Sequence, residues 1–258
     1  MKAHPVLREL PQHIQQKLVV SPAEDLSSIP GCNRRKRKKM KEEGFVAHLY
    51  AGESEGYSLA RAFKEVGGDP NLLVEIDIKR DSEERHGRSH DMLRDHDGPY
   101  PSLLRAALDG GLKALVMGPN CRTRSVLRHY PLPVPGGGPR PVRSWEEPWG
   151  KSTNTAEEQK KVVEDDVLLW RGLMLYIVQE EIRRAVGKGE ESKMKLALEQ
   201  PADPSHYVPE VVSFWGTKEW KKLQNMYQLQ EQTFRQSSFG GRAVKPTTFG
   251  GDLRLCVP

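Results

Sequence analysis

The feature that most constrains the fold is an alternation, between residues 44 and 201, of short apolar runs with segments of helical periodicity. The apolar runs are short enough for buried strands and are expected at 44–50, 72–78, 113–117 and 195–199. Strands that alternate with helices pair in parallel through right-handed crossovers. The sequence therefore predicts an α/β fold with a doubly wound, mostly parallel sheet.

The longest helix is expected at 155–186, where Thr155 and Glu158 have the spacing of a capping box ahead of an apolar face. A long loop is expected within 130–154, because residues 131–150 hold six prolines and four glycines. A further helix is expected within 209–230. The last thirty residues are mixed in character and predict either a hairpin or an irregular edge.

Residues 1–43 predict a flexible basic arm ahead of a single domain at 44–258, because four prolines precede a basic run and only one short apolar patch occurs there. The run at 34–41 holds seven Lys or Arg residues, and removing these seven from the formal charge of +5 leaves about −2 for the rest. Such a run is typical of a nuclear-import signal or a nucleic-acid-binding arm, and a solvated linker is the alternative. The candidate nucleic-acid contacts in it are Arg34, Arg35, Lys36, Arg37, Lys38 and Lys39.

Several classes of protein are excluded by composition. No run approaches the roughly 20 apolar residues that span a bilayer, and the N-terminus lacks the apolar region of a signal peptide. The three cysteines are too scattered for a disulfide framework, and the eight histidines have no metal-ligand spacing. We therefore expect a protein of the nucleus or cytoplasm without a membrane span or a metal site.

Candidate ligand contacts follow the expected strands, because open parallel sheets bind ligands beyond the carboxyl ends of their strands. After the first strand, YAGESEG (50–56) places two glycines before a helix, where backbone N–H groups can approach a ligand. Glu75, in the second strand, is suited to accepting hydrogen bonds from two ribose hydroxyls. These residues predict a ligand that contains a nucleoside.

Five segments, in this order, resemble motifs of the cytosine-5 DNA methyltransferase family: HLYAGESEGYSLARAF (48–63), VEID (74–77), HDML (90–93), GPNCRTRS (118–125) and ALEQP (197–201). The resemblance covers roughly residues 44–201. It implies the methyltransferase type of Rossmann-like fold, S-adenosylmethionine as cofactor and nucleic acid, DNA first of all, as partner. Its first motif implies contacts to the methionine part of the cofactor, Glu75 would bind the ribose and Asp91 the adenine amine. The full set of implied cofactor contacts is Tyr50, Ala51, Gly52, Glu53, Gly56, Glu75, Asp91 and Gly118.

The resemblance also implies how methyl transfer would proceed. Cys121 would be the nucleophile, whose thiolate adds to the cytosine ring and raises the electron density at the neighbouring carbon. Glu199 would stabilise the ring protonated at nitrogen. Arg122 and Arg124 are expected to lower the pKa of Cys121 and to contact nucleic acid. The target base must leave the duplex for this chemistry.

Three functions stay open. The chain is an active methyltransferase, or a catalytically inactive module or mobile-element remnant that keeps the fold and binds nucleic acid, or an unrelated nucleotide-binding protein. A separate partner chain that supplies target recognition fits the first.

Overall fold

The strands of the chain form a six-stranded, mostly parallel mixed sheet in the order β2-β1-β3-β4-β6-β5. The structure is a computed structural model that describes residues 4–52, 58–83, 88–130, 139–239 and 245–252. Its strands are β1 (Phe45–Leu49), β2 (Leu73–Ile76), β3 (Leu112–Met117), β4 (Lys195–Pro201), β5 (Gln230–Arg235) and β6 (Pro246–Gly251). Its α-helices are α1 (Gln12–Leu18), α2 (Arg34–Glu43), α3 (Leu59–Glu65), α4 (Tyr100–Leu108), α5 (Ala156–Ala185) and α6 (Lys218–Tyr227). The predicted α/β class is confirmed.

The chain forms two compact units, each of which is described by itself. Unit 1 comprises residues 1–16, 119–167 and 198–258, and unit 2 comprises residues 17–118 and 168–197. The first part of α5, as far as Val167, belongs to unit 1, and the rest of the helix belongs to unit 2. Among the described helices, none combines the length and the apolar character needed to cross a bilayer.

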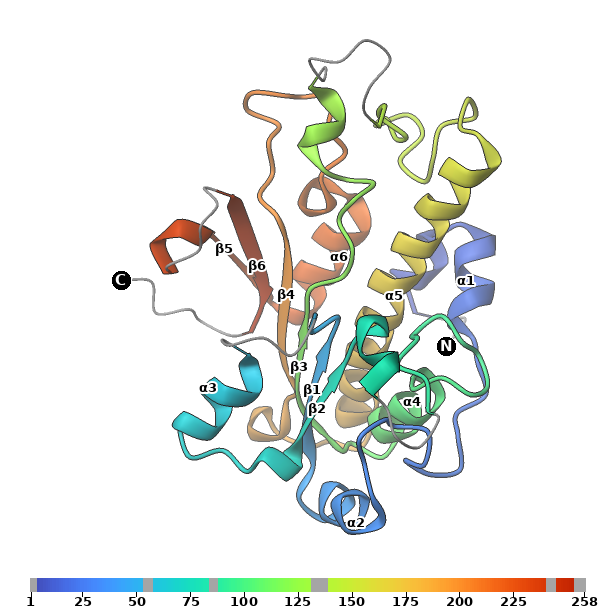
Figure 1. Cartoon of the computed structure of the whole chain (residues 1–258). Helices are drawn as coiled ribbons and strands as arrows, with labels where there is room; N and C mark the ends of the chain where they lie inside the picture. Colours follow the sequence, from blue (N-terminus) through green and yellow to red (C-terminus); the bar gives the residue numbers. More distant parts are fainter. Residues whose placement is uncertain (1–3, 53–57, 84–87, 131–138, 240–244, 253–258) are drawn as a thin grey trace. The chain divides into compact units, whose positions relative to one another are not determined.

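In unit 2, β1 pairs in parallel with β2 and with β3, as the alternation of strands and helices predicts. The three strands lie side by side in Figure 1. Phe45, Ala47 and Leu49 of β1 are buried, while the residues between them are partly exposed. The register places His48 opposite Glu75, so the two side chains share one face of the sheet at neighbouring positions.

In unit 1, β5 and β6 form an antiparallel hairpin, which decides between the two predictions for the C-terminal region. Gly250 of β6 lies against the indole rings of Trp215 and Trp220, and a Cβ there would lie 2.5 Å and 2.6 Å from them. The two rings pack edge to face with their centroids 5.0 Å apart. A residue without a side chain is therefore required at position 250, and both tryptophans are buried core residues.

The N-terminus of α5 forms the predicted capping box. The backbone N–H of Glu158 donates to Thr155 Oγ1 over 3.2 Å, and the N–H of Thr155 donates to Glu158 Oε2 over 2.8 Å. The loop before it contains no helix or strand over 139–150, as its prolines predict. Residues 131–138 of that loop lie outside the described residues.

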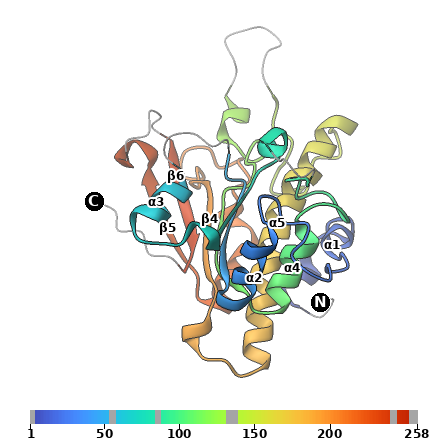
Figure 2. The same ribbon diagram turned by 60° about the horizontal axis from the view of Figure 1, so that its bottom comes forward.

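The prediction of a flexible arm at 1–43 is wrong. This segment contains α1 and α2 (Figure 2), and its apolar side chains are packed. Its buried residues are Val6, Leu7, Leu10, Ile14, Leu18, Leu26, Ile29, Cys32 and Met40. Because these apolar residues are spread along the segment and form only short runs, they do not resemble a core element in the sequence, yet together they bury enough surface to order the segment. Residues 4–16 pack within unit 1 and residues 17–43 within unit 2.

Candidate functional site

Cys121, the expected nucleophile, borders a cavity of about 380 Å³ in unit 1. The thiol is free and half-buried. The cavity is lined by Cys121, Arg124, Ser125, Val126, Leu127, Gln200, Pro201, Ala202, Pro204, Tyr207, Ser213, Phe214, Lys245 and Pro246. Most of these side chains are apolar or aromatic. The cavity therefore suits a flat, weakly polar group, such as a heterocyclic ring, more than a highly charged one.

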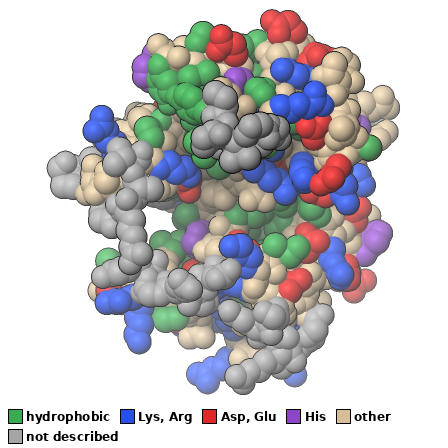
Figure 3. Space-filling view, turned by 45° about the horizontal axis from the view of Figure 1, so that its top comes forward, with side chains coloured by type: hydrophobic (Ala, Val, Ile, Leu, Met, Phe, Trp, Pro, Cys, Tyr) green, Lys and Arg blue, Asp and Glu red, His purple; other side chains and the backbone are tan. Residues whose placement is uncertain are grey.

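Exposed apolar side chains also occur around this part of unit 1. Leu127 and Tyr207, which line the cavity, are 70% and 50% exposed, and Trp145 is 40% exposed. Figure 3 draws one face of the molecule, on which apolar side chains gather in one area and Lys and Arg side chains lie among acidic ones in another. Large exposed apolar groups beside a cavity are a common feature of ligand sites.

Glu199, the expected contact to the cytosine ring, forms an ion pair in the same unit. Its Oε1 lies 3.6 Å from Lys245 Nζ, and Gln236 Nε2 donates to the same oxygen over 3.5 Å. The next residue, Gln200, donates from Nε2 to the carbonyl oxygen of Pro119 over 2.9 Å. Neighbouring residues of a strand point to opposite faces. On one face of β4, Gln200 contacts the loop that contains Cys121, and on the other face Glu199 contacts Lys245.

The expectation that neighbouring arginines lower the pKa of Cys121 is wrong. Burial raises the pKa of the Cys121 thiol above its usual value, and the charge of Glu199 acts in the same direction. The ammonium of Lys245 acts against both. At neutral pH the thiol of Cys121 is therefore mostly protonated, and Lys245 is the cation that favours the thiolate.

Arg122 and Arg124 do not act on the thiol because both are tied to α5. Arg122 Nε donates to Asp165 Oδ1 over 2.8 Å, and Arg122 Nη2 donates to Glu164 Oε2 over 2.9 Å. Arg124 Nη2 donates to Asp166 Oδ1 over 3.0 Å. The side chain of Arg124 is only 6% exposed, so it offers no surface contact to nucleic acid. The side chain of Arg122 is 42% exposed and stays accessible.

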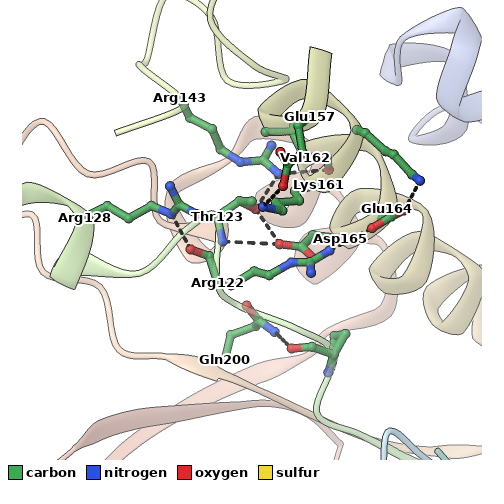
Figure 4. Close-up of polar contacts among 12 residues, drawn as sticks. Arg122, Thr123, Arg128, Arg143, Glu157, Lys161, Val162, Glu164, Asp165 and Gln200 are labelled. Atoms are coloured by element: carbon green, nitrogen blue, oxygen red, sulfur yellow. Dashed lines mark hydrogen bonds and ion pairs between the residues drawn. The ribbon is translucent and has the colours of Figure 1, made fainter. Parts of the chain in front are cut away.

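A buried network, which the sequence reasoning missed, holds the residues that follow Cys121. Asp165 Oδ2 accepts hydrogen bonds from the backbone N–H of Thr123 (3.2 Å) and from Thr123 Oγ1 (2.7 Å). Arg143 donates from Nη2 to the same hydroxyl oxygen over 2.9 Å and from Nη1 to Asp166 Oδ2 over 2.9 Å. Figure 4 shows Arg122 and Thr123, from the loop after Cys121, directed toward Asp165 of α5, while Arg143 comes from another segment and donates to Thr123 and to the carbonyl oxygen of Val162.

The signal for this network was present in the sequence as two adjacent aspartates, 165 and 166, inside an otherwise apolar helical segment. Both aspartates are buried, and an unpaired carboxylate there would be costly. Two such residues within a helix interior therefore require cationic partners, and the nearest basic sequence after Cys121 supplies them.

In unit 2, the expected cofactor loop begins with a residue in an unusual conformation. Tyr50 has a φ of 61°, which is uncommon for a residue with a side chain. Its side chain is half-buried, and its hydroxyl donates to the carbonyl oxygen of Leu168 over 2.6 Å. Gly52 has a φ of 71°, a conformation that favours glycine, and no atom of the described residues other than its chain neighbours lies within 4 Å of the place where a Cβ would stand.

Glu75, the expected ribose contact, is held by two side chains. Its Oε1 lies 3.3 Å from His48 Nδ1, and Arg80 Nη1 donates to its Oε2 over 3.0 Å. The hydrogen bond with His48, and after it that with Arg80, lower the pKa of Glu75 to about 2 against the effect of burial. Arg80 Nε also donates to the carbonyl oxygen of Gly52 over 2.7 Å. Glu75 is therefore ionised and fixed beside the Gly52 turn.

This arrangement is compatible with a ribose. A carboxylate can accept about four hydrogen bonds, and the contacts to His48 and Arg80 use two. Glu75 also borders a pocket of about 300 Å³ in unit 2, together with Lys36, Arg80 and His90. Glu75 therefore keeps acceptor capacity at the edge of a pocket in unit 2.

Of the other expected cofactor contacts, Asp91, Gly118 and Ala51 belong to the described residues, and two do not. Asp91 Oδ1 accepts from the backbone N–H of Leu93 over 2.8 Å and so stabilises its own loop. The N–H of Gly118 donates to the carbonyl oxygen of Leu49 over 3.3 Å, at the end of β3. Ala51 is half-buried beside Gly52. Glu53 and Gly56 lie outside the described residues.

Comparison with models of known protein families, with curated proteins and with solved structures found no match for the chain. Among the described residues, no group of three or more His, Cys, Asp or Glu side chains is arranged to hold a metal ion.

Proposed function

We propose that the chain is an S-adenosylmethionine-dependent methyltransferase of the cytosine-5 type, with Cys121 as nucleophile. The observation that carries the proposal is that Cys121, which follows a parallel strand in sequence, borders a cavity of about 380 Å³ lined by residues at the end of β4. A buried cysteine that served only as a core residue would not require such a cavity. The resemblance of five ordered segments to motifs of that family adds independent support.

The side chains of unit 1 can carry out the steps on a cytosine. The Cys121 thiolate would add to the ring carbon next to the methylated one, with its proton going to solvent. Lys245 would favour the thiolate. Glu199 would give up its ion pair with Lys245, take up a proton from solvent and donate that proton to the ring nitrogen. S-adenosylmethionine would supply the methyl group. Loss of the proton from the methylated carbon to solvent then expels the Cys121 thiolate, and return of the ring-nitrogen proton to Glu199 leaves the neutral methylated cytosine.

The network on Asp165 and Asp166 would keep this loop in place during the reaction. Its hydrogen bonds fix both the backbone and the side chain of Thr123, two residues after the nucleophile. Groups held in this way lose little entropy in the transition state.

The test has two parts. Calorimetry on the full chain should show binding of S-adenosylmethionine, and Glu75→Gln should weaken it at least tenfold, since a neutral amide is a poorer acceptor for ribose hydroxyls. The matched control is Glu65→Gln, an exposed carboxylate of the same unit that pairs with Arg61. Absence of binding in a folded protein would refute the cofactor assignment.

The second part tests the nucleophile. A duplex that carries fluorine on the carbon to be methylated should trap the protein covalently. After methyl transfer this carbon has no hydrogen that can be lost as a proton, so the thiolate cannot be expelled. Cys121→Ser should abolish the adduct, and Cys32→Ser, at a buried cysteine in unit 2, should keep it. An adduct that persists in Cys121→Ser would refute the assignment.

A non-catalytic nucleic-acid-binding module is the second candidate. The raised pKa of Cys121 favours it, because a thiol without an activating base is a weak nucleophile. Binding of S-adenosylmethionine without any adduct would support this candidate over the first.

A further inference from the structure

The basic run at 34–41 is part of a helix with two different faces. All seven of its cations lie in α2, which begins with Asn33 as its N-cap, since Asn33 Oδ1 accepts from the N–H of Lys36 over 2.9 Å. Lys36 Nζ donates to the carbonyl oxygen of Leu73 over 2.8 Å, and Lys39 pairs with Asp69. These two lysines therefore fasten the helix to unit 2.

The other face of α2 points to solvent. Arg34, Arg35, Lys38 and Lys41 are exposed, and with Arg37 and Asp25 they border a shallow hollow of about 710 Å³. Figure 1 shows α2 at the bottom of the view, and in Figure 2 this end of the molecule is turned toward the viewer. The hollow thus has five cationic side chains and one carboxylate around it.

We infer that this face of α2 binds the phosphate backbone of double-stranded nucleic acid. Four exposed cations from Arg34 to Lys41 occupy about 10 Å of helix, at a rise of about 1.5 Å per residue. This is about one cation per 3.5 Å, which matches the one phosphate per about 3.4 Å along each strand of a DNA duplex, whereas an extended peptide, whose side chains alternate between two faces, offers at most about one acidic group per 7 Å on one face. A nucleic acid duplex is therefore the partner whose charge density can match this face.

Two properties of α2 distinguish a duplex from other anionic partners. A helix that lies on a lipid surface needs an apolar face, and the apolar residue of α2, Met40, is fully buried. Proteins that bind single strands add aromatic side chains on which bases stack, and α2 contains no aromatic residue. Contacts to the backbone of a duplex require neither, so they fit the composition of this face.

The inference does not rest on the proposed methyl transfer, because binding to phosphates requires neither Cys121 nor the cofactor. It also corrects the contact set expected from the sequence, because the structure assigns Lys36 and Lys39 to the packing of α2 and adds Lys41 to the binding face.

The experiment measures binding of the full chain to a fluorescent 20-base-pair DNA duplex at a series of salt concentrations, without S-adenosylmethionine. The variant carries Arg34→Gln, Arg35→Gln, Lys38→Gln and Lys41→Gln, which keep the helix-forming character of α2. Loss of four phosphate contacts should reduce the slope of log K against log salt by about 3.6. Between 50 and 200 mM salt, the wild type should then lose about a hundredfold more affinity than the variant.

The matched control removes the same charge elsewhere, by replacing with Gln the exposed cations Arg61, Arg105, Lys161 and Arg184. Its salt slope should stay close to that of the wild type. A double variant, Arg34→Gln with Lys38→Gln, should lose about half as much slope as the fourfold variant, and it keeps the test valid if the latter does not fold.

Three results would overturn the inference. Equal losses in the α2 variant and in the control variant would show that only net charge matters. An unchanged slope in the α2 variant would show that this face does not contact phosphates. Binding of the wild type to vesicles with anionic lipid but not to the duplex would show that the partner is a membrane surface.

Discussion

Replacement of Asp166 by Ala tests whether the buried network holds unit 1 together. Asp166 is 1% exposed, and its two oxygens accept from Arg124 (3.0 Å) and Arg143 (2.9 Å), whose side chains are 6% and 2% exposed. Removal of the carboxylate leaves two buried guanidinium groups without the negative charge that balances them, although Arg143 keeps its hydrogen bonds to Thr123 and to backbone carbonyl oxygens. Burial already lowers the pKa of Arg124 to about 10, which shows how little solvation this charge receives.

Loss of one partner from a buried ion pair costs about 3–5 kcal/mol, because the remaining charge stays desolvated. We expect Asp166→Ala to lower the free energy of unfolding by that amount, out of a typical total of about 5–15 kcal/mol. Urea unfolding followed by tryptophan fluorescence should show a midpoint lower by about 2 M, for a denaturant slope of about 2 kcal/mol/M. Asp166→Asn keeps one acceptor oxygen and should lie between wild type and Asp166→Ala.

The control is Glu157→Ala on the same helix. Glu157 pairs with Lys161 over 2.6 Å, but the two side chains are 76% and 42% exposed, so this pair should contribute no more than about 1 kcal/mol. If Asp166→Ala and Glu157→Ala destabilise the protein equally, the guanidinium groups must reach water or another acceptor. The account of the network as a buried, desolvated cluster would then be wrong.

Three further predictions concern single groups. The rate of Cys121 alkylation can be measured in a Cys32→Ser and Cys256→Ser background. Because burial raises the pKa of the thiol, this rate should still rise above pH 9, and Lys245→Ala should lower the rate at pH 8. A rate that reaches its plateau below pH 8 would contradict this prediction. The pKa of Glu75 in the folded protein is about 2, below its usual value, so this group stabilises the fold above about pH 4.5 and its contribution is lost as the pH falls toward 2. In urea titrations across this pH window, Glu75→Gln should therefore lose less stability than the wild type, by at most about 3 kcal/mol. Tyr50→Phe removes the hydrogen bond to the Leu168 carbonyl and should lower stability by about 1–2 kcal/mol by the same assay, and no change would show that water replaces the hydroxyl.

The regular elements were predictable because their patterns are local. Each predicted strand between Phe45 and Glu199 contains a short run of Val, Leu or Ile, and the long helix begins at a capping box that the structure reproduces. The N-terminal segment failed for a physical reason. Val6, Leu10, Ile14 and Leu18 recur at every fourth position, which is a helical period, but the four prolines of the segment, only one of which lies among these residues, suggested a flexible chain. A proline at the start of a helix does not prevent it, as Pro11 before α1 shows.

The sequence allows candidate site residues to be named, but it does not allow their electrostatics to be predicted. Cys121 and Glu199 could be chosen from the order of motifs, since each motif is contiguous in the chain. The partners of Arg122 and Arg124 could not be chosen in this way, because Asp165 and Asp166 lie more than forty residues further along. Proximity in sequence suggested that the arginines act on the thiol, whereas the helix that packs against them determines where their charge is used.

This use of charge has a consequence for the chemistry of the loop. Asp165 and Asp166 are neighbours on a helix and so point about 100° apart, which lets each take a different set of donors. Asp166 accepts hydrogen bonds from Arg124 and Arg143, and Asp165 accepts them from Thr123 and Arg122. The two buried guanidinium groups, those of Arg124 and Arg143, are therefore balanced by two buried carboxylates. The positive charge that follows Cys121 is therefore used to fix the loop and not to lower the thiol pKa. Activation of Cys121 must then come from Lys245 or from the approach of a substrate, and the response of the alkylation rate to Lys245→Ala distinguishes these two sources.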